Sequence, residues 1–292
     1  MILVTGGSGQ LAHALEDAAG SRPLRRVGRP AFDFEAPDSI AATMEAARPS
    51  LVINAAAWTA VDAAEQHQEA ALRANRDGPM MLARLCADAG IPLIHLSTDY
   101  VFDGTKGAPY LETDPPQPLG VYGTSKLDGE QAVLAACPRA IVVRTSWVYA
   151  ASGSNFVRTM LRAREKTDRL RVVADQRGCP TAAPALADAL LAVADQVEGG
   201  WSARFGGIFH ASGTGDTTWH GLATAVFEAA SAHGVSPPCI APIATAEWPT
   251  PVRRPPDSRL DCGKLAAVFG VRLPPWRDSL DSVIAQIFRH PA

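Results

Sequence analysis

The first twelve residues constrain the fold more than any other stretch. A short apolar run, Ile2–Val4, leads into Thr5-Gly6-Gly7-Ser8-Gly9-Gln10-Leu11-Ala12, and an Ala- and Leu-rich stretch follows. This order predicts a strand, a glycine turn and a helix. Gly6 permits the tight turn, Gly9 lets the backbone approach a pyrophosphate at the positive helix end, and Ala12 allows close helix packing. The spacing is G-x-x-G-x-x-A, not the usual G-x-G-x-x-G, so the turn alone is weak evidence for a dinucleotide.

Two later apolar runs predict buried parallel strands that end at one edge of a sheet. Leu51–Ile53 is followed by Asn54-Ala55-Ala56-Ala57-Trp58-Thr59, whose small residues let a flat cofactor lie close. Leu93–Leu96 delivers Ser97-Thr98-Asp99-Tyr100 to the same edge, where ligands gather in open α/β sheets. We therefore expect an α/β fold with a doubly wound parallel (Rossmann) sheet, and residues 1–150 as its dinucleotide-binding core.

Residues 151–292 are expected to form mostly a smaller C-terminal, substrate-binding lobe. Strands near 170–174 and 207–211 are expected to return from it to the core sheet. The segment 236–258 is dense in proline, which predicts ordered loops. This segment contains Arg253 and Arg254, and Arg259 lies just beyond it. These three arginines either meet a nucleotide diphosphate or are exposed loop residues.

The second predicted strand, Leu24–Val27, ends among arginines where an NAD-binding protein carries an acidic residue. Arg25, Arg26 and Arg29 suit the 2′-phosphate of NADP, which favours NADPH over NADH. Each is equally well explained as part of a solvated basic edge. Asp33, just beyond, either reaches the adenosine half of the cofactor or caps the next turn.

The stretch Tyr122-Gly-Thr-Ser-Lys126 places a phenol and an ammonium one helical turn apart. A lysine cation beside a phenol lowers the phenol pKa, which is about 10 when unperturbed, so that tyrosine passes a proton near neutral pH. Thr98 is either a structural strand-end residue or, with this pair, the third member of a catalytic trio that holds a substrate carbonyl. The trio predicts a carbonyl reductase.

Trp147 follows another β-branched run, Ala140–Ser146, and so comes at a further strand end. An aromatic ring there either stacks on a sugar or base of a ligand, or covers the core as a lid. The residues alone favour neither interpretation.

Composition excludes several classes of function. A net charge of -3 without a basic stripe argues against a nucleic-acid partner. The 5 cysteines are far apart and form no C-x-x-C pair, which argues against a disulfide framework or a zinc site. No apolar run approaches the ~20 residues of a membrane helix. The chain opens on a strand-like run without a leader, so we expect a cytoplasmic protein.

Together these motifs resemble the extended short-chain dehydrogenases/reductases and, within them, the dTDP-4-dehydrorhamnose reductase family. The resemblance spans the whole chain. Its later parts are Arg144–Tyr149, Asn155-Phe156, Asp175-Gln176 with Pro180-Thr181, and Arg253–Asp261. It implies that NADPH or NADH reduces the 4-keto group of dTDP-4-dehydro-L-rhamnose to give dTDP-L-rhamnose, the last step of dTDP-rhamnose biosynthesis.

The resemblance also implies roles for single residues. Tyr122 would protonate the developing alkoxide, Lys126 would lower the Tyr122 pKa and hold the nicotinamide ribose, and Thr98 would hydrogen-bond near the reacting oxygen. Asp99 and Trp147 would contact the substrate together with Thr98. With the positions inferred above, the predicted cofactor contacts are Gly6, Gly9, Gln10, Leu11, Arg29, Asp33, Ala55, Ala56, Ala57, Trp58, Thr59, Tyr122 and Lys126.

The sequence departs from the family pattern at two positions. Some family members dimerise through magnesium held by acidic residues, but the matching position here is Ala14, so we predict no structural metal and a monomer or weak homodimer. The aromatic residue or histidine that commonly follows the Asn-Ala-Ala-Ala run is here Trp58.

One alternative function is another nucleotide-sugar reductase or epimerase of this superfamily. The other is a non-catalytic nucleotide-binding subunit, because the fold also resembles the regulatory subunit of methionine adenosyltransferase; the intact trio argues against it.

Overall fold

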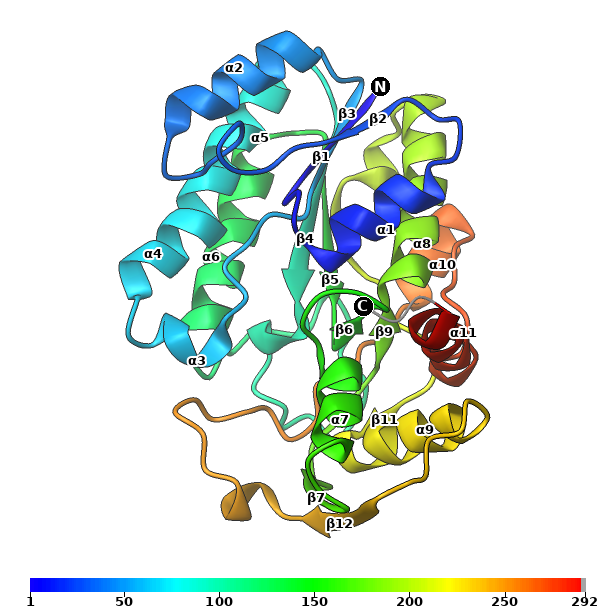
Figure 1. Ribbon diagram of the computed structural model, residues 1–292. Helices are drawn as coiled ribbons and strands as arrows, with labels where there is room; N and C mark the ends of the chain where they lie inside the picture. Colours follow the sequence, from blue (N-terminus) through cyan, green and yellow to red (C-terminus); the bar gives the residue numbers. More distant parts are fainter. Residues whose placement is uncertain (290–292) are drawn as a thin grey trace.

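A parallel sheet of six strands forms the centre of the molecule (Figure 1). The computed structural model describes residues 1–289. All five strand pairings in this sheet are parallel. In spatial order the strands are β10 (Gly207–His210), β5 (Ala140–Thr145), β4 (Leu93–Thr98), β3 (Leu51–Asn54), β1 (Ile2–Thr5) and β2 (Leu24–Arg26).

The strand order reverses direction between β1 and β3. From β1 the chain first builds β2 on one side, then crosses back to β3 on the other side and continues outward through β4 and β5. Strands β1, β3, β4 and β5 are buried along their whole length, as expected for apolar strands covered on both faces. The carboxyl ends of β1 and β3 therefore flank the crevice in which such sheets bind ligands.

Helices cover both faces of this sheet (Figure 1). One face carries α2 (Pro37–Ala47), α5 (Gly78–Asp88) and α6 (Val121–Ala136), which enclose an apolar cluster around Leu3, Ile40 and Leu82. The other face carries α1 (Gln10–Ala18), α8 (Ala183–Glu198) and α10 (Gly263–Phe269) over a second cluster around Leu15 and Leu186. This arrangement confirms the predicted doubly wound α/β sheet.

A smaller lobe lies beyond the carboxyl ends of the strands, in the lower part of Figure 1. A third apolar cluster, which includes Leu222, Val226 and Leu280, fills the space between its helices. Its helices are α7 (Phe156–Arg164), α9 (Trp219–Ser231) and α11 (Trp276–Arg289). Its strand pairs are β7 (Arg169–Val173) with β12 (Cys239–Ile243), β6 (Val148–Tyr149) with β9 (Thr181–Ala182), and β8 (Arg177–Gly178) with β11 (Thr217–Thr218).

One of the two strands expected to rejoin the core sheet does not do so. β10 (Gly207–His210) is the edge strand of the core sheet, next to β5. The expectation for residues 170–174 is wrong, because β7 pairs in parallel with β12 inside the lobe. The burial pattern explains this: Leu170 and Val172 point inward while Arg169 and Arg171 are exposed, so only one face of the strand is covered. The division of the chain at residue 150 stays a prediction.

Residues 256–261, here called the closing segment, connect the core to the lobe. On one side, Tyr110 N–H donates to Arg259 C=O at 2.7 Å, and Asp261 N–H donates to Tyr110 C=O at 2.8 Å. On the other side, Arg177 N–H donates to Pro256 C=O at 2.8 Å, and Ser258 N–H donates to Arg177 C=O at 2.9 Å. The segment thus lies as an extended strand between a loop of the core and β8 of the lobe.

The helices are short. The longest, α6 and α8, have 16 residues each. Within residues 1–289, no helix combines the length and the apolar character that crossing a bilayer requires.

Candidate active site

The glycine turn lies where the chain reverses direction in the sheet. Gly6 has φ +82°, a region that L-residues with side chains avoid. A Cβ at this position would come within 2.7 Å of the Ala55 carbonyl oxygen, so the turn also needs the absence of a side chain. Gly9 precedes α1 and offers no side chain to its first turn, which leaves the positive helix end facing the turn. This geometry fits the pyrophosphate of a dinucleotide.

A buried polar network fixes the neighbouring strand ends. Thr5 Oγ1 donates to Asn54 Oδ1 at 2.5 Å, and the same oxygen accepts the Ala56 N–H at 3.2 Å. Asn54 Nδ2 lies 2.9 Å from Nδ1 of His95, which is fully buried. Burial lowers the His95 pKa well below its ordinary value, so the ring is neutral at pH 7. The ends of β1, β3 and β4 are therefore held together beneath the predicted cofactor contacts.

Asn75 is a residue that the sequence analysis missed. Its Oδ1 accepts the Trp58 N–H at 2.8 Å, while its Nδ2 donates to Trp58 C=O at 3.1 Å and to Ser125 Oγ at 2.9 Å. It connects the loop after β3, which carries the predicted contacts Ala57 to Thr59, with the helix of Tyr122. Asn75 sits in a π-helical turn (Arg73–Asp77) between α4 (Gln68–Leu72) and α5, and no sequence pattern signals that turn.

The other predicted cofactor contacts have mixed surroundings. Leu11 packs into the core, and Gln10 Oε1 accepts from Asn155 Nδ2 at 2.7 Å. Arg26 is tied to Glu16 at 3.0 Å and to the Gly7 carbonyl, so it braces the glycine turn. Asp33 Oδ1 accepts the Glu35 N–H at 3.0 Å, which is a turn cap.

Arg29 is exposed on the loop after β2, and so is Arg25 on β2 itself. Arg26, by contrast, donates a hydrogen bond to the Gly7 carbonyl of the glycine turn. A contact of Arg29 with the 2′-phosphate of NADP stays a prediction.

The predicted trio converges at the end of β4 and the start of α6. Tyr122 lies in the first turn of α6 and meets the ring of Tyr100 edge-to-face, with 5.7 Å between ring centroids. Burial raises the pKa of Tyr122 to about 12, and a hydrogen bond with Thr98 opposes that rise. Tyr122 is therefore a phenol at neutral pH, with its proton available for transfer.

Lys126, one helical turn after Tyr122 on α6, is buried. Its Nζ donates to the Leu96 carbonyl of β4 at 2.6 Å. Burial lowers the pKa of Lys126 to about 8, and the nearby carboxylate of Glu130 opposes the change. The ammonium form still predominates at pH 7. Its predicted effect on the Tyr122 pKa stays a prediction.

A buried ion pair anchors this part of α6 to β5. Arg144 and Glu130 are 2% and 1% exposed and form two hydrogen bonds, Nε to Oε1 at 2.8 Å and Nη2 to Oε2 at 2.6 Å. Ser97 Oγ also donates to Glu130 Oε1 at 2.5 Å. The pair fixes α6 against the sheet, one helical turn after Lys126.

Asp99 is also a buried carboxyl group, with 2% of its surface exposed. Its Oδ2 accepts from Ser258 Oγ at 2.6 Å, and its Oδ1 accepts from Thr98 Oγ1 at 3.2 Å. Burial raises the pKa of Asp99 to about 7, while hydrogen bonds from Ser258 and Thr98 oppose the rise. Ser258 lies in the segment Arg253–Asp261 that carries part of the family resemblance, but the sequence assigned it no role in the site.

A cavity of about 730 Å³ is lined by Tyr100, whose ring packs on that of Tyr122. Its walls come from α7, β7, α9, the loop after β12, and two core residues. The residues that matter below are Asp62, Tyr100, Phe156, Arg169, Arg171, Trp219, Trp248 and Arg254. Arg254 Nη2 donates to Asp62 Oδ2 at 2.7 Å, so this pair joins lobe and core at the cavity wall.

Trp147 lies behind the cavity. Its ring stacks face-to-face on that of Trp219, with centroids 3.5 Å apart and the planes inclined by 6°. Its φ of +49° is unusual for a bulky residue. A Cβ at Gly178 would lie 2.4 Å from Cε2 of Trp147, so the ring is closely packed there too. Trp147 positions Trp219, which lines the cavity, and its own contact with substrate stays a prediction.

Titratable groups do not assemble into a metal site in the part of the chain that the structure describes. Within residues 1–289, no three His, Cys, Asp or Glu side chains are grouped so that they could hold an ion.

Comparison with known families agrees with this geometry. The profile of the RmlD substrate binding domain matches residues 1–289. The chain belongs to this RmlD family. A relative from Sinorhizobium fredii, named dTDP-4-dehydrorhamnose reductase, is 46% identical over 95% of this chain and 94% of its own. A relative of the same name from Burkholderia thailandensis is 41% identical over 94% and 95%.

Solved structures of RmlD relatives share the whole fold. The dTDP-4-dehydrorhamnose reductase of Clostridium acetobutylicum is 33% identical and has a TM-score of 0.89, with 98% of this chain and 99% of that chain covered. The Bacillus anthracis reductase, solved in complex with NADP, is 29% identical with the same TM-score and 98% coverage of both chains. The family and the doubly wound fold predicted from the sequence are therefore confirmed.

Proposed function

We propose that this protein is an NADPH-dependent oxidoreductase that reduces the 4-keto group of dTDP-4-dehydro-L-rhamnose to give dTDP-L-rhamnose. The observation that carries the proposal is the meeting of Thr98, Asp99 and Tyr122 behind the cavity-lining Tyr100, at the carboxyl edge of the sheet that also holds the glycine turn. Family membership and the names of the relatives support the choice of substrate.

Tyr122 is the proposed proton donor. With its pKa raised by burial to about 12, it holds its proton until an alkoxide develops on the substrate. The bound nicotinamide would supply the hydride to the carbonyl carbon. Lys126, charged below its pKa of about 8, would stabilise the phenolate that remains on Tyr122.

The chain offers suitable groups for a dinucleotide. The turn at Gly6 and the uncapped start of α1 would hold the pyrophosphate, and the loop after β3 would lie along the nicotinamide half. The NADP complex of the Bacillus anthracis relative supports NADP(H) as the cofactor. Exposed Arg29 remains our candidate for the 2′-phosphate.

The cavity is the proposed site of the nucleotide sugar. Arg169, Arg171 and Arg254 give its wall three cationic groups, which suit a diphosphate. Phe156, Trp219 and Trp248 supply aromatic faces for a base or sugar. Of the three C-terminal arginines singled out from the sequence, only Arg254 lines this cavity: Arg259 is paired with Asp257, and Arg253 is exposed.

We further propose a cytoplasmic enzyme that works as a monomer or weak homodimer, without nucleic acid or a membrane as a partner. The cysteines are all free, which suits a reducing compartment. Sedimentation at several protein concentrations would measure the oligomeric state.

The test is an assay with purified protein, NADPH and dTDP-4-dehydro-L-rhamnose, run in parallel with NADH. We expect loss of nicotinamide absorbance and a product whose NMR spectrum shows a new C4 hydroxyl with the rhamno configuration. Oxidation of NADPH only with a different nucleotide sugar would point to another reductase of the superfamily. No oxidation with any nucleotide sugar would contradict the catalytic proposal.

A further inference from the structure

Asp99 lies between two hydroxyl donors that come from opposite parts of the molecule. Thr98, its neighbour on β4, donates to Oδ1 at 3.2 Å. Ser258, from the closing segment, donates to Oδ2 at the shorter distance of 2.6 Å. Ser258 is 2% exposed, so solvent water does not readily replace its hydroxyl as a donor to Asp99. The carboxylate is buried, and it needs these donors to remain ionised near neutral pH.

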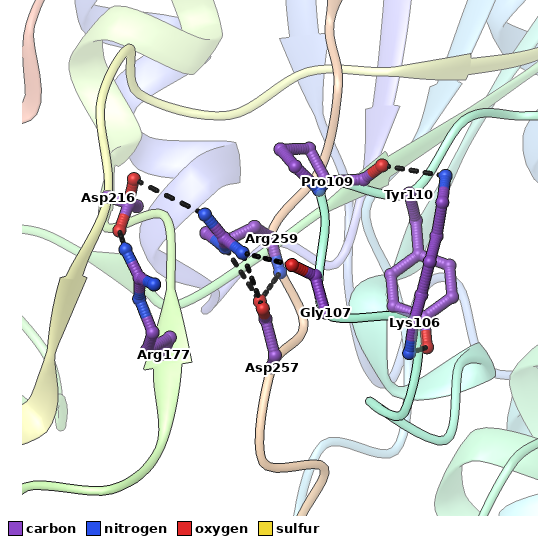
Figure 2. A network of polar contacts seen from close by, with 8 residues as sticks. All are labelled: Lys106, Gly107, Pro109, Tyr110, Arg177, Asp216, Asp257 and Arg259. Carbon is purple, nitrogen blue, oxygen red and sulfur yellow. Dashed lines mark hydrogen bonds and ion pairs between the residues drawn. The ribbon is translucent and has the colours of Figure 1, made fainter.

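Side-chain contacts around Arg259 add to the backbone hydrogen bonds of the closing segment (Figure 2). Arg259 forms a bidentate pair with Asp257, through Nε to Oδ1 at 2.8 Å and Nη2 to Oδ2 at 2.6 Å. Its Nη2 also donates to the Gly107 carbonyl of the core loop at 3.2 Å. On the lobe side, Arg259 Nη1 lies 3.9 Å from Asp216 Oδ1, and Asp216 Oδ2 in turn accepts from Arg177 Nη2 at 2.6 Å. Together with the backbone bonds on both sides, these contacts fix the Ser258 hydroxyl against Asp99.

Thr98 has a single hydroxyl proton and two acceptors that compete for it. One is Asp99 Oδ1, and the other is the Tyr122 oxygen, whose phenolate a hydrogen bond with Thr98 stabilises. Before proton transfer Tyr122 is a neutral phenol, so the Thr98 proton points to Asp99. When the O–H bond of Tyr122 breaks and a new O–H bond forms on the substrate, the phenolate becomes a strong acceptor. The Thr98 hydroxyl must then rotate away from Asp99.

We propose that Ser258 is a positioning residue for the reduction, which satisfies the Asp99 carboxylate so that the Thr98 proton is free to turn to Tyr122. The inference rests on the proposed reductase function and adds a residue to it. Without the Ser258 hydroxyl, Thr98 would be the one side-chain donor left to Asp99, and at pH values where Asp99 is ionised the Thr98 proton would be held on that carboxylate. The lobe, through its contacts with the closing segment, thereby contributes to proton transfer in the core.

The first test compares Ser258→Ala with Ser212→Ala. Ser212 is equally buried, at 2%, but its hydroxyl faces two cysteine sulfurs outside the site, that of Cys262 at 3.4 Å and that of Cys179. We expect Ser258→Ala to lower kcat about tenfold, the size of a lost hydrogen bond to a charged group, with the Kd for NADPH unchanged. Ser212→Ala should stay within about twofold of the wild type. Ser258→Cys keeps the packing with a weaker donor, and it answers the question if Ser258→Ala is too unstable to assay.

A double-mutant cycle separates positioning from a general structural role. If Ser258 acts through the Asp99 charge, Ser258→Ala should have less than about a twofold effect on kcat when Asp99→Asn is already present. The same loss in both backgrounds would overturn the inference. A kcat of Ser258→Ala within about twofold of that of an active wild type would also overturn it.

A readout that is independent of turnover follows the ¹³Cγ resonance of Asp99 against pH. The titratable and charged groups around it are Tyr122, Tyr100 and, across the Tyr100 ring, the Arg254–Asp62 pair. The wild-type midpoint should lie at about 7 and move upward in Ser258→Ala, because one donor to the ionised form is lost. An unchanged midpoint would overturn the inference even if the reductase assay itself fails, whereas an inactive wild type with a shifted midpoint would contradict only the proposed function.

Discussion

The two sides of the site are built in different ways. On the cofactor side, the glycine turn and the loop after β3 follow directly from two adjacent strands, and backbone geometry fixes them. On the substrate side, the cavity wall is assembled from segments as distant in the chain as Asp62 and Arg254, and side-chain pairs hold them together. We infer that changes on the cofactor side act through backbone strain or burial, whereas changes on the substrate side act through single contacts.

The largest expected effect is on the stability of the core behind the site. Glu130→Gln should lower the free energy of unfolding by ~3–5 kcal/mol, because Arg144 is left as an uncompensated buried charge. Denaturant titration measures this change. The matched control is Glu228→Gln, whose partner Arg277 is as exposed as Glu228 itself, and it should cost less than ~1 kcal/mol. Equal losses in the two variants would show that the core pair does not anchor α6.

The glycine turn offers the next largest effect. Gly6→Ala places a Cβ at positive φ and within 2.7 Å of the Ala55 carbonyl, so the backbone must shift. We expect kcat/KM to fall by about a hundredfold through misplacement of the cofactor. Gly90→Ala is the control, since Gly90 also has positive φ but open space around it, and its cost should be limited to ~1–2 kcal/mol of stability. If both variants bind NADPH like the wild type, the close approach at Gly6 is not needed.

On the substrate side, Arg254→Ala removes a cation of the cavity wall together with its pair to Asp62. We expect the KM for the nucleotide sugar to rise about tenfold and the Kd for NADPH to stay the same, because a charge-assisted contact with the diphosphate is lost. Steady-state kinetics and fluorescence titration measure the two constants. Arg253→Ala, an exposed neighbour, is the matched control. A tenfold loss of NADPH affinity in Arg254→Ala would instead mean that the two sides are not separable.

The smallest effect is the pH dependence due to Lys126. Its folded pKa is lowered to about 8 by burial, so the ammonium is lost as pH rises and kcat/KM should fall about fourfold between pH 7 and 8.5. Over the same interval the unfolded chain binds more protons at this lysine than the folded chain, so the contribution of Lys126 to the free energy of unfolding increases with pH. Destabilisation of the fold by the titration of Lys126 therefore does not explain the fall in kcat/KM. Lys126→Arg, which stays charged, should flatten the profile; an unchanged profile would assign it to another group.

The sequence predicted the parts of the site that follow one another along the chain. The turn at Gly6, the strand ends at Asn54 and Thr98, and the spacing of Tyr122 and Lys126 all depend on local pattern, and the doubly wound sheet follows from the order of these motifs.

The parts that the sequence did not predict depend on pairing between distant segments. β7 was expected in the core sheet because its run of residues fits any strand, and only its pairing with β12 places it in the lobe. Asn75 reaches Trp58 because of a π-helical turn, and Ser258 reaches Asp99 because the closing segment is held between a loop of the core and β8. Such contacts arise from tertiary packing and leave no periodic signal.

The most direct test of the central claim is a single-turnover measurement on Tyr122→Phe at saturating NADPH and dTDP-4-dehydro-L-rhamnose. The account predicts wild-type affinity for NADPH, since the phenylalanine ring keeps the packing on Tyr100. It also predicts a rate of NADPH oxidation lower by about a hundredfold or more, since the proton donor is removed. An oxidation rate equal to that of the wild type would contradict the claim that Tyr122 supplies the proton.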